Sequence, residues 1–256
     1  ELMMDENSGL PSVKEVFDTT PYTILVVDDN PDMTDFLKRT FEGYFKRIII
    51  AGDGVEALQL VRSHVPDIIV SDVMMPRMNG YELCKTIKED IAISHIPVIL
   101  LTAKDDKQSL ISGYKNGADG YLSKPFEVEM LMELIRNRLK NREYTKKRYL
   151  NAGLIPTPEE STISLTDETF LIKLNSIIQE NIDNTNLGIQ FICQEVGLGR
   201  SSLYNKLKAL TGMGANEYIS KLRIEKAITL ISGTDMPFSE IAEKTGFTTP
   251  SYFSTA

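Results

Sequence analysis

Short runs of apolar, β-branched residues alternate with helical patterns through the first half of the chain. The apolar runs lie at Thr23–Val27, Arg47–Ala51, Ile68–Ser71, Val98–Thr102 and Gly120–Leu122. The helical patterns cover residues 31–43, 54–64, 79–90, 106–117 and 127–143. Strands that are apolar throughout are buried on both faces, and strand–helix alternation gives a parallel sheet covered by helices on both sides. We therefore predict an α/β doubly wound domain with five parallel strands.

The second half of the chain has helical patterns only, and it contains a weak internal repeat. The predicted helices cover residues 168–182, 188–196, 200–210, 214–231 and 237–245, with another beginning at 249. Ile192–Leu198 aligns with Ile241–Phe247 at an offset of 49 residues, with the glycine in register. A helix, a glycine turn and a second, polar-faced helix form a helix-turn-helix, although any two amphipathic helices joined at glycine give a similar pattern. We predict an all-α domain with two helix-turn-helix units.

Proline and small polar residues mark the boundary between the two halves. Pro156 and Pro158 lie in a stretch rich in Ser and Thr, which is typical of a linker. Residues 136–148 carry seven bases and one acid, Glu143, just before this stretch. We expect an N-terminal extension over residues 1–20, a first domain over 21–143, a linker over 144–166 and a helical domain over 167–256.

Composition narrows the class of protein. The chain has 256 residues and a formal charge of −8, which argues against coating nucleic acid or a membrane surface by bulk charge. No apolar run approaches the ~20 residues that span a bilayer. Cys84 and Cys193 lie far apart, which excludes a disulfide framework and indicates a reducing cytosol. Because the chain begins with Glu1 and stops within a helical pattern, we expect it to be part of a longer protein whose C-terminal domain is cut short.

Polar residues follow the predicted strands of the first domain at their carboxyl ends. Asp28 and Asp29 follow the first strand, and Asp72 follows the third. Thr102 ends the fourth strand, and Lys124 follows the fifth. Three carboxylates at one edge repel one another, and Mg²⁺ with its preference for carboxylate and water oxygens resolves this. Each Asp taken alone is more often a turn or cap residue, but five polar groups at the strand ends indicate phosphoryl transfer to a carboxylate.

The first domain resembles a response-regulator receiver domain of the two-component type, which has a flavodoxin-like fold. The resemblance is carried by Asp28–Asp29, Asp72 to Gly80, Leu101–Lys104, Gly117–Tyr121 and Lys124–Phe126. It implies Asp72 as phosphoacceptor, with Mg²⁺ bound by Asp28, Asp29, Asp72 and the backbone carbonyl of Met74. It also implies Lys124 as the partner of the phosphoryl group, Thr102 and Tyr121 as switch residues, and a cis Lys124–Pro125 bond.

The helical domain has one basic, polar helix in the position where a helix-turn-helix contacts DNA. No acid occurs between Glu195 and Glu217, whereas Arg200, Lys206 and Lys208 do. The domain resembles an AraC-type DNA-binding domain in Ser201–Lys208, Tyr218–Ala227, Ile241–Phe247 and Ser251–Ser254. A solvated helix face is the alternative. The side chains expected at DNA are those of the two recognition helices: Arg200, Ser201, Ser202, Tyr204, Asn205, Lys208, Thr249, Ser251 and Tyr252.

Together the two resemblances imply a transcription regulator controlled by phosphorylation. The expected partners are a histidine kinase, double-stranded DNA and a second copy of the chain bound through the receiver, and the domain itself is not expected to be an enzyme. The order of domains resembles the C-terminal part of a hybrid sensor, whose longer chain could be anchored in the inner membrane, and a freestanding regulator is the alternative. A Mg²⁺-dependent phosphotransferase and an adaptor without DNA binding are rival functions from other classes.

Overall fold

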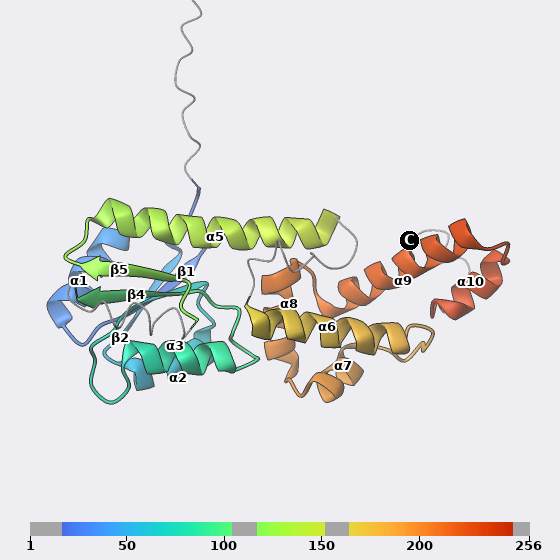
Figure 1. Cartoon of the computed structure of the whole chain (residues 1–256), viewed down its shortest axis with the longest axis horizontal. Coiled ribbons are helices and arrows are strands. Elements are labelled where there is room, and N and C mark those ends of the chain that lie inside the picture. The colour runs from blue at the N-terminus through green and yellow to red at the C-terminus, as the bar shows by residue number, and fades with distance from the viewer. Residues whose placement is uncertain (1–16, 104–116, 152–163, 248–256) are drawn as a thin grey trace, which may run out of the picture.

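The structure is a computed structural model that describes residues 17–103, 117–151 and 164–247 (Figure 1). The first domain contains five strands: β1 (Thr23–Val27), β2 (Arg47–Ala51), β3 (Ile68–Asp72), β4 (Val98–Ala103) and β5 (Gly120–Lys124). They form one sheet in the order β2-β1-β3-β4-β5, and every pair is parallel. The predicted doubly wound sheet is confirmed. Residues 106–116 of the helix expected over 106–117 lie outside the described part of the chain.

Helices cover both faces of this sheet, because alternate strand residues point to opposite sides. The described helices of the first domain are α1 (Pro31–Phe41), α2 (Gly54–His64), α3 (Gly80–Glu89) and α5 (Val128–Asn151). Ile24 and Val26 pack with α1 and α5, whereas Leu25 and Val27 pack with α2 and α3. All four strand residues are at most 1% exposed, so β1 is buried on both faces, as its apolar sequence predicts.

The helix beginnings near the carboxyl ends of the strands are fixed by short polar side chains. The Asn30 side chain accepts a hydrogen bond from the Asp32 amide, and Pro31 opens α1. Asn79 and Glu82 form a reciprocal capping box at the start of α3. Such caps satisfy amides that have no partner inside the helix. They also fix the loops that leave β1 and β3, which carry the acidic residues of interest.

The helical domain contains α6 (Leu165–Glu180), α7 (Ile189–Val196), α8 (Arg200–Thr211), α9 (Ala215–Gly233) and α10 (Phe238–Lys244). The repeat seen in the sequence has a matching backbone conformation. Gly197 after α7 has φ 72°, and Gly246 after α10 has φ 69°, in the left-handed region that glycine adopts without strain. In both copies the next residue donates its amide to the helix, Leu198 to the Cys193 carbonyl and Phe247 to that of Ala242.

Helix α5 is longer than the sequence pattern predicted. The expected helix ended at residue 143, but α5 continues to Asn151, into the range expected to be linker. Tertiary contacts account for the extension. Tyr149 is 5% exposed and belongs to the core of the helical domain, and Lys221 of α9 donates to the Leu150 carbonyl at 3.1 Å. The C-terminal part of α5 therefore belongs to both domains, and it extends beyond the sheet alongside the helical domain (Figure 1).

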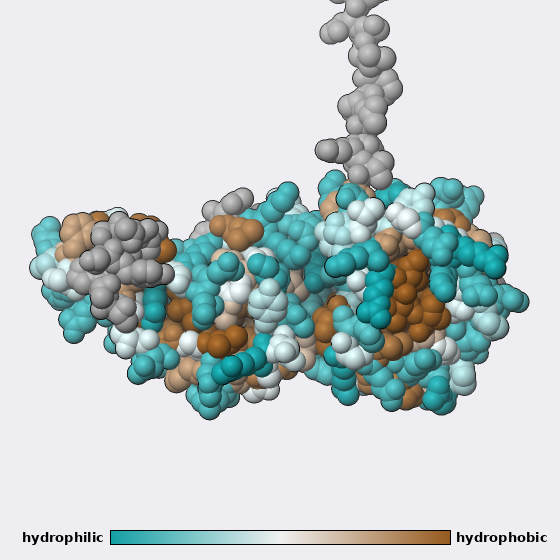
Figure 2. All heavy atoms as spheres, turned by 180° about the vertical axis from the view of Figure 1, so that it is seen from behind, coloured by the Kyte–Doolittle hydropathy of each residue, from teal (hydrophilic) through white to brown (hydrophobic). Residues whose placement is uncertain are grey.

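The face seen from behind is mainly hydrophilic, with a hydrophobic patch on the first domain, which lies on the right in this view (Figure 2). Among the described helices, none combines the length and the apolar character needed to cross a bilayer.

Gly80 marks a place where the backbone leaves no room for a side chain. A Cβ atom built on Gly80 would lie 2.2 Å from the Asp72 carbonyl oxygen. We predict that Gly80→Ala lowers the free energy of unfolding by about 1–3 kcal/mol, because forced overpacking against backbone costs this much. Chemical denaturation followed by circular dichroism measures the change.

Gly52→Ala is the matched control in the same domain. Its Cβ atom would meet only the flexible Glu56 carboxylate, at an ordinary 3.5 Å. Equal stability of the two variants would contradict the close approach of α3 to β3.

Candidate functional site

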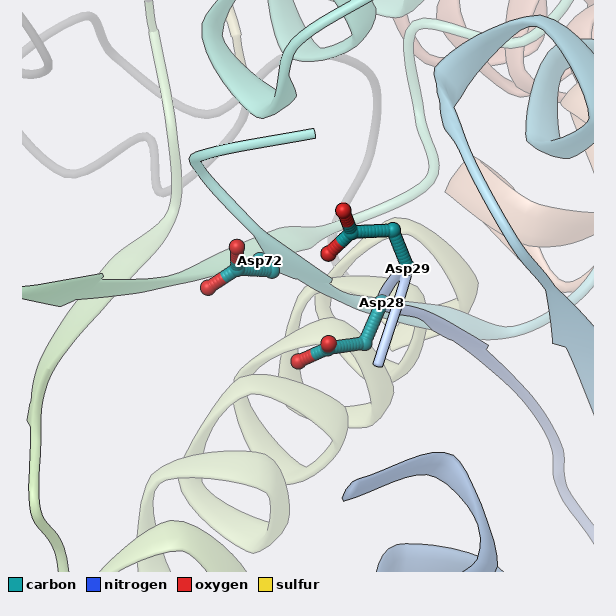
Figure 3. A group of neighbouring side chains, drawn as sticks. All are labelled: Asp28, Asp29 and Asp72. Atoms are coloured by element: carbon teal, nitrogen blue, oxygen red, sulfur yellow. The ribbon is translucent and has the colours of Figure 1, made fainter. Parts of the chain in front are cut away.

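Three carboxylates converge at the carboxyl edge of the sheet. Asp28 and Asp29 follow β1, and Asp72 is the last residue of β3. The two strands are neighbours, with Val27 opposite Ser71, so their ends meet. One oxygen of each carboxylate lies within 4.8 Å of the others, and Figure 3 shows the three side chains grouped at this edge. The convergence predicted from the strand ends is confirmed.

Lys124 joins the two buried carboxylates. Its Nζ lies 2.6 Å from Asp72 Oδ1 and 2.8 Å from Asp28 Oδ2. Lys124 is the last residue of β5, the outermost strand, and is in register with Ala103 at the end of β4. Its side chain crosses the end of β4 to reach β3 and β1. The structure thus brings together the acids and the lysine that the sequence placed on three separate strands.

Backbone amides hold each buried carboxylate in one orientation. The Asn30 amide donates to Asp28 Oδ1 at 2.9 Å, and the Met74 amide donates to Asp72 Oδ2 at 3.0 Å. Asp28 is 3% exposed and Asp72 is 8% exposed, whereas Asp29 faces solvent. Each buried carboxylate therefore uses one oxygen for an amide and the other for Lys124.

Burial sets the protonation behaviour of the pair. Burial raises the pKa of Asp72, although its hydrogen bond to Lys124 opposes the rise. Burial alone would lower the pKa of Lys124, but the hydrogen bonds to Asp28 and Asp72 outweigh it, and the pKa is raised. Lys124 therefore stays charged at neutral pH.

The donor set fits a hard divalent cation. Three carboxylates face one ammonium group, and oxygen ligands from one or two carboxylates plus water are what Mg²⁺ takes in proteins. Met74 lies two residues after Asp72, and its carbonyl stays a predicted ligand.

The two switch candidates lie on the strands next to this edge. Thr102 is 3% exposed near the end of β4. Tyr121 lies on β5 and is partly buried against the core formed by α2 and α3. The Lys124–Pro125 peptide bond is cis, as expected.

The polar face of α8 is accessible to a partner. Arg200, Ser201, Tyr204 and Lys208 are exposed, and Ser202 and Asn205 are partly exposed. Positions 200, 204 and 208 are four residues apart and share one face of the helix. Arg200 donates to the Gln190 side chain at 2.8 Å, so its guanidinium is oriented at the start of the helix. The candidates Thr249, Ser251 and Tyr252 lie outside the described residues.

Lys206 was not among the side chains expected at DNA, and the structure places it away from the exposed face of α8. It is 0% exposed and lies on the opposite side of the helix from Tyr204. The signal was present in the sequence, since Lys206 falls in the helical stripe of Leu203, Leu207 and Leu210, which are all buried. Its partners, Asp167 and Ser94, carried no sequence signal because they lie 39 and 112 residues away.

Removing the charge of Asp72 should stabilise the first domain. The raised pKa means that the ionised carboxylate is less favourable in the folded state, and this penalty is complete above the folded-state pKa. We expect Asp72→Asn to raise the free energy of unfolding by about 0.5–2 kcal/mol at pH 7 without divalent ions, as stabilising substitutions commonly do. The gain should shrink as pH falls through the raised pKa, because wild-type Asp72 then takes up a proton.

Asp35→Asn, an exposed acid on α1, is the control and should change stability little at either pH. Denaturant titrations at pH 7 and pH 4 measure both variants. A destabilised Asp72→Asn protein would show that the ion pair with Lys124 outweighs the cost of burial.

Comparison with known proteins gives two family matches and several relatives. Residues 24–136 match the response regulator receiver domain, and residues 192–256 match a helix-turn-helix domain. Histidine kinase P4 of Formosa agariphila is 40% identical over 232 residues, 91% of this chain but 17% of that protein. The DNA-binding response regulator MtrA of Mycolicibacterium smegmatis is 37% identical over 136 residues, 53% of this chain and 58% of that protein.

The response regulator MprA of Mycobacterium sp. (strain KMS) is 36% identical over 165 residues, which cover 59% of this chain and 70% of that protein. The chain thus covers only part of the length of the first two relatives. The match to MprA, the receiver model and the five-stranded parallel sheet agree. The chain belongs to the response regulators of two-component signalling, with a receiver domain followed by an AraC-type helix-turn-helix domain.

Proposed function

We propose that the chain is a transcription regulator whose DNA binding is controlled by phosphorylation of Asp72. The observation that carries the proposal is the Lys124 ion pair with Asp28 and Asp72, in a chain that continues into a helix-turn-helix domain. The carboxylates supply a phosphoacceptor and a cation site, and the exposed face of α8 supplies a surface for DNA. Neither feature alone distinguishes a regulator from an isolated phosphoacceptor or an isolated DNA-binding protein.

The chemistry assigned to the receiver is transfer of a phosphoryl group from a kinase phosphohistidine to Asp72. A carboxylate oxygen of Asp72 forms the new bond to phosphorus while the bond to the histidine nitrogen breaks, and the histidine nitrogen keeps the electron pair. Lys124 lies 2.6 Å from Asp72 Oδ1, so its positive charge is in place to pair with the added phosphoryl oxygens. Mg²⁺ held by Asp28, Asp29, Asp72 and the Met74 carbonyl would neutralise charge that develops during transfer.

Two residues are assigned to the response. Thr102 would turn its hydroxyl toward the phosphoryl oxygens, and Tyr121 would move inward behind it. Thr102 lies on β4, and Tyr121 lies on β5, the strand that forms one side of the sheet and leads into α5. We assign dimer formation to this side, where a second copy of the receiver would bind.

The relatives favour a hybrid protein over a freestanding regulator. The kinase from Formosa agariphila aligns with 91% of this chain. We therefore propose that the chain is the C-terminal part of a protein that also carries a histidine kinase, which would be the phosphodonor. The regulator accepts the phosphoryl group and is not itself assigned an enzyme activity on small molecules.

The phosphoacceptor assignment has a direct test. With Mg²⁺ and beryllofluoride, the protein should form one adduct detected by its fluorine resonance, and Asp72→Asn should form none. Asp28→Asn should need at least about tenfold more Mg²⁺, because loss of even indirect ligand support weakens metal binding this much. Asp35→Asn on the exposed face of α1 is the control and should match the wild type. A normal adduct in Asp72→Asn would refute the assignment.

The DNA-binding assignment is tested on α8. Duplex DNA is titrated with protein at several salt concentrations. Loss of a phosphate contact in Arg200→Ala or Lys208→Ala should weaken binding to all sequences and reduce the salt slope by about one. Loss of a base contact at Asn205 should cost about 1–3 kcal/mol and relax one position of the preferred site.

Lys173→Ala, an exposed lysine on α6, controls for the loss of a positive charge alone. A triple variant replaces Arg200, Asn205 and Lys208 by alanine. If it keeps wild-type affinity and salt slope, α8 is only solvated, and the adaptor function replaces DNA binding.

A further inference from the structure

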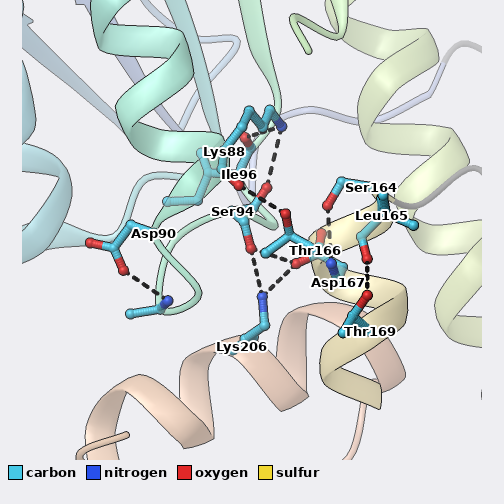
Figure 4. A network of polar contacts seen from close by, with 11 residues as sticks. Lys88, Asp90, Ser94, Ile96, Ser164, Leu165, Thr166, Asp167, Thr169 and Lys206 are labelled. Carbon is cyan, nitrogen blue, oxygen red and sulfur yellow. Dashed lines mark hydrogen bonds and ion pairs between the residues drawn. The ribbon is translucent and has the colours of Figure 1, made fainter. Parts of the chain in front are cut away.

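A buried polar junction joins α8 to the receiver domain. Lys206 Nζ contacts the Asp167 carboxylate of α6 and donates to Ser94 Oγ at 2.8 Å, and Ser94 Oγ donates to Asp167 Oδ1 at 2.7 Å. Ser94 lies in the receiver, in the segment between α3 and β4 (Figure 4). The three side chains thus form a closed triangle contributed by two domains.

The triangle is shielded from water. Lys206 and Ser94 are both 0% exposed and Asp167 is 3% exposed. Burial lowers the pKa of Lys206, while Asp167 acts in the opposite direction. A charged lysine in such a place is stable only with its partners present, because an unpaired buried charge is strongly unfavourable. Separating the domains would remove Ser94 from the pair and admit water to it.

Further contacts hold the same junction. The Thr166 hydroxyl donates to the Lys88 carbonyl at 3.1 Å, and Lys88 is itself held by Asp119 at 2.7 Å and by the Ile96 carbonyl at 2.9 Å. Ile91 of the receiver packs against the core of the helical domain. The continuous helix α5 packs along α8 and contributes Tyr149 to that core.

The junction lies at the other end of the sheet from Asp72. Ser94 precedes β4 and Asp119 precedes β5, whereas Asp72 ends β3. A strand of five residues separates these two edges by roughly 15 Å, at about 3.3 Å per residue. Figure 1 shows the strand arrows pointing away from the helical domain. A phosphoryl group on Asp72 therefore cannot touch the junction.

The receiver does not cover the face of α8 that is proposed to bind DNA, so it does not block DNA binding by steric contact with that face. Lys206 faces the junction, while Arg200, Tyr204 and Lys208 on the opposite side are exposed. Separation of the domains would uncover the face around Lys206 and leave the proposed DNA-binding face as it is.

We infer that Lys206 is a positioning residue that fixes α8 to the receiver, so that the two domains turn as one rigid body. Phosphorylation then controls DNA binding through the arrangement of whole chains relative to one another, and not by release of the helical domain. This inference rests on the proposed function for its link to DNA, but the rigid connection can be measured without DNA.

The experiment measures a distance between the two domains within one chain. Spin labels are placed at two exposed sites, Glu42→Cys on the receiver and Ser220→Cys on α9. Cys193 is replaced by Ser, so the only native cysteine that remains is the buried Cys84. The labelled protein is diluted in an excess of unlabelled protein, so that only distances within one chain contribute. Pulsed electron resonance should then give one narrow distance that is unchanged when Mg²⁺ and beryllofluoride are added. A longer or broader distribution in the adduct would overturn the inference, because it would show release.

Two variants test the junction itself. Ser94→Ala removes the receiver's hydroxyl and leaves the Lys206–Asp167 pair, and the double variant Lys206→Met with Asp167→Leu removes both charges together. Each should at least double the width of the distance distribution. Lys173→Met, an exposed lysine on α6, is the matched control and should leave it narrow. An unchanged width in Ser94→Ala and in the double variant would show that Lys206 does not position α8.

The same samples separate this inference from the proposed function. Fluorine resonance reports whether the Asp72 adduct forms, so its absence in the wild type would contradict the phosphoacceptor assignment and not the rigid junction. In the double variant the adduct should form normally, while the ratio of DNA affinities with and without beryllofluoride should fall toward one. A wild-type ratio in a protein with a loosened junction would show that rigid positioning does not transmit the signal.

Discussion

The contact of Lys124 with two carboxylates from different strands is the interaction on which the receiver edge depends. Asp28 and Asp72 are buried, and each would repel the other without the ammonium group between them. One lysine does not neutralise three carboxylates, so the edge keeps an excess of negative charge. This imbalance suits a site that gains a divalent cation and then a phosphoryl group. Burial is the main cause of the raised pKa of Asp72, and the charge of Asp28 acts in the same direction.

A second buried lysine shows how the same chemistry serves a different purpose. Lys206 also lies between a carboxylate and an oxygen atom, but here one positive charge meets one negative charge. This triangle is closed, so we assign it a positioning role and not ligand binding. Lys124 lies where the strands of the sheet end, and Lys206 of α8 lies near the opposite edge, where the strands begin. The edge proposed to react is thereby separated from the edge that joins the domains.

Helix α5 packs against both the sheet of the receiver and the core of the helical domain. Its first half packs on the sheet through Leu131, Ile135 and Leu139, and its second half contributes Tyr149 to the core of the helical domain. A helix with 24 residues is about 36 Å long at 1.5 Å per residue, so it spans both domains without a hinge in the backbone. The side of the receiver that we propose for dimer formation includes this helix. If two receivers paired through α5 change their relative orientation, the α8 of each chain would move together with its own receiver.

The sequence by itself determined the sheet, the order of elements and the converging acids, because these follow from local periodicity and from the rule that parallel strands end at one edge. Asp28, Asp29, Asp72 and Lys124 could be placed together for this reason. The length of α5 and the contacts that Lys206 makes were decided by tertiary structure alone. Both depend on partners far along the chain, Lys221 for the end of α5 and Ser94 for Lys206, and no pattern near either residue records which distant surface will cover it.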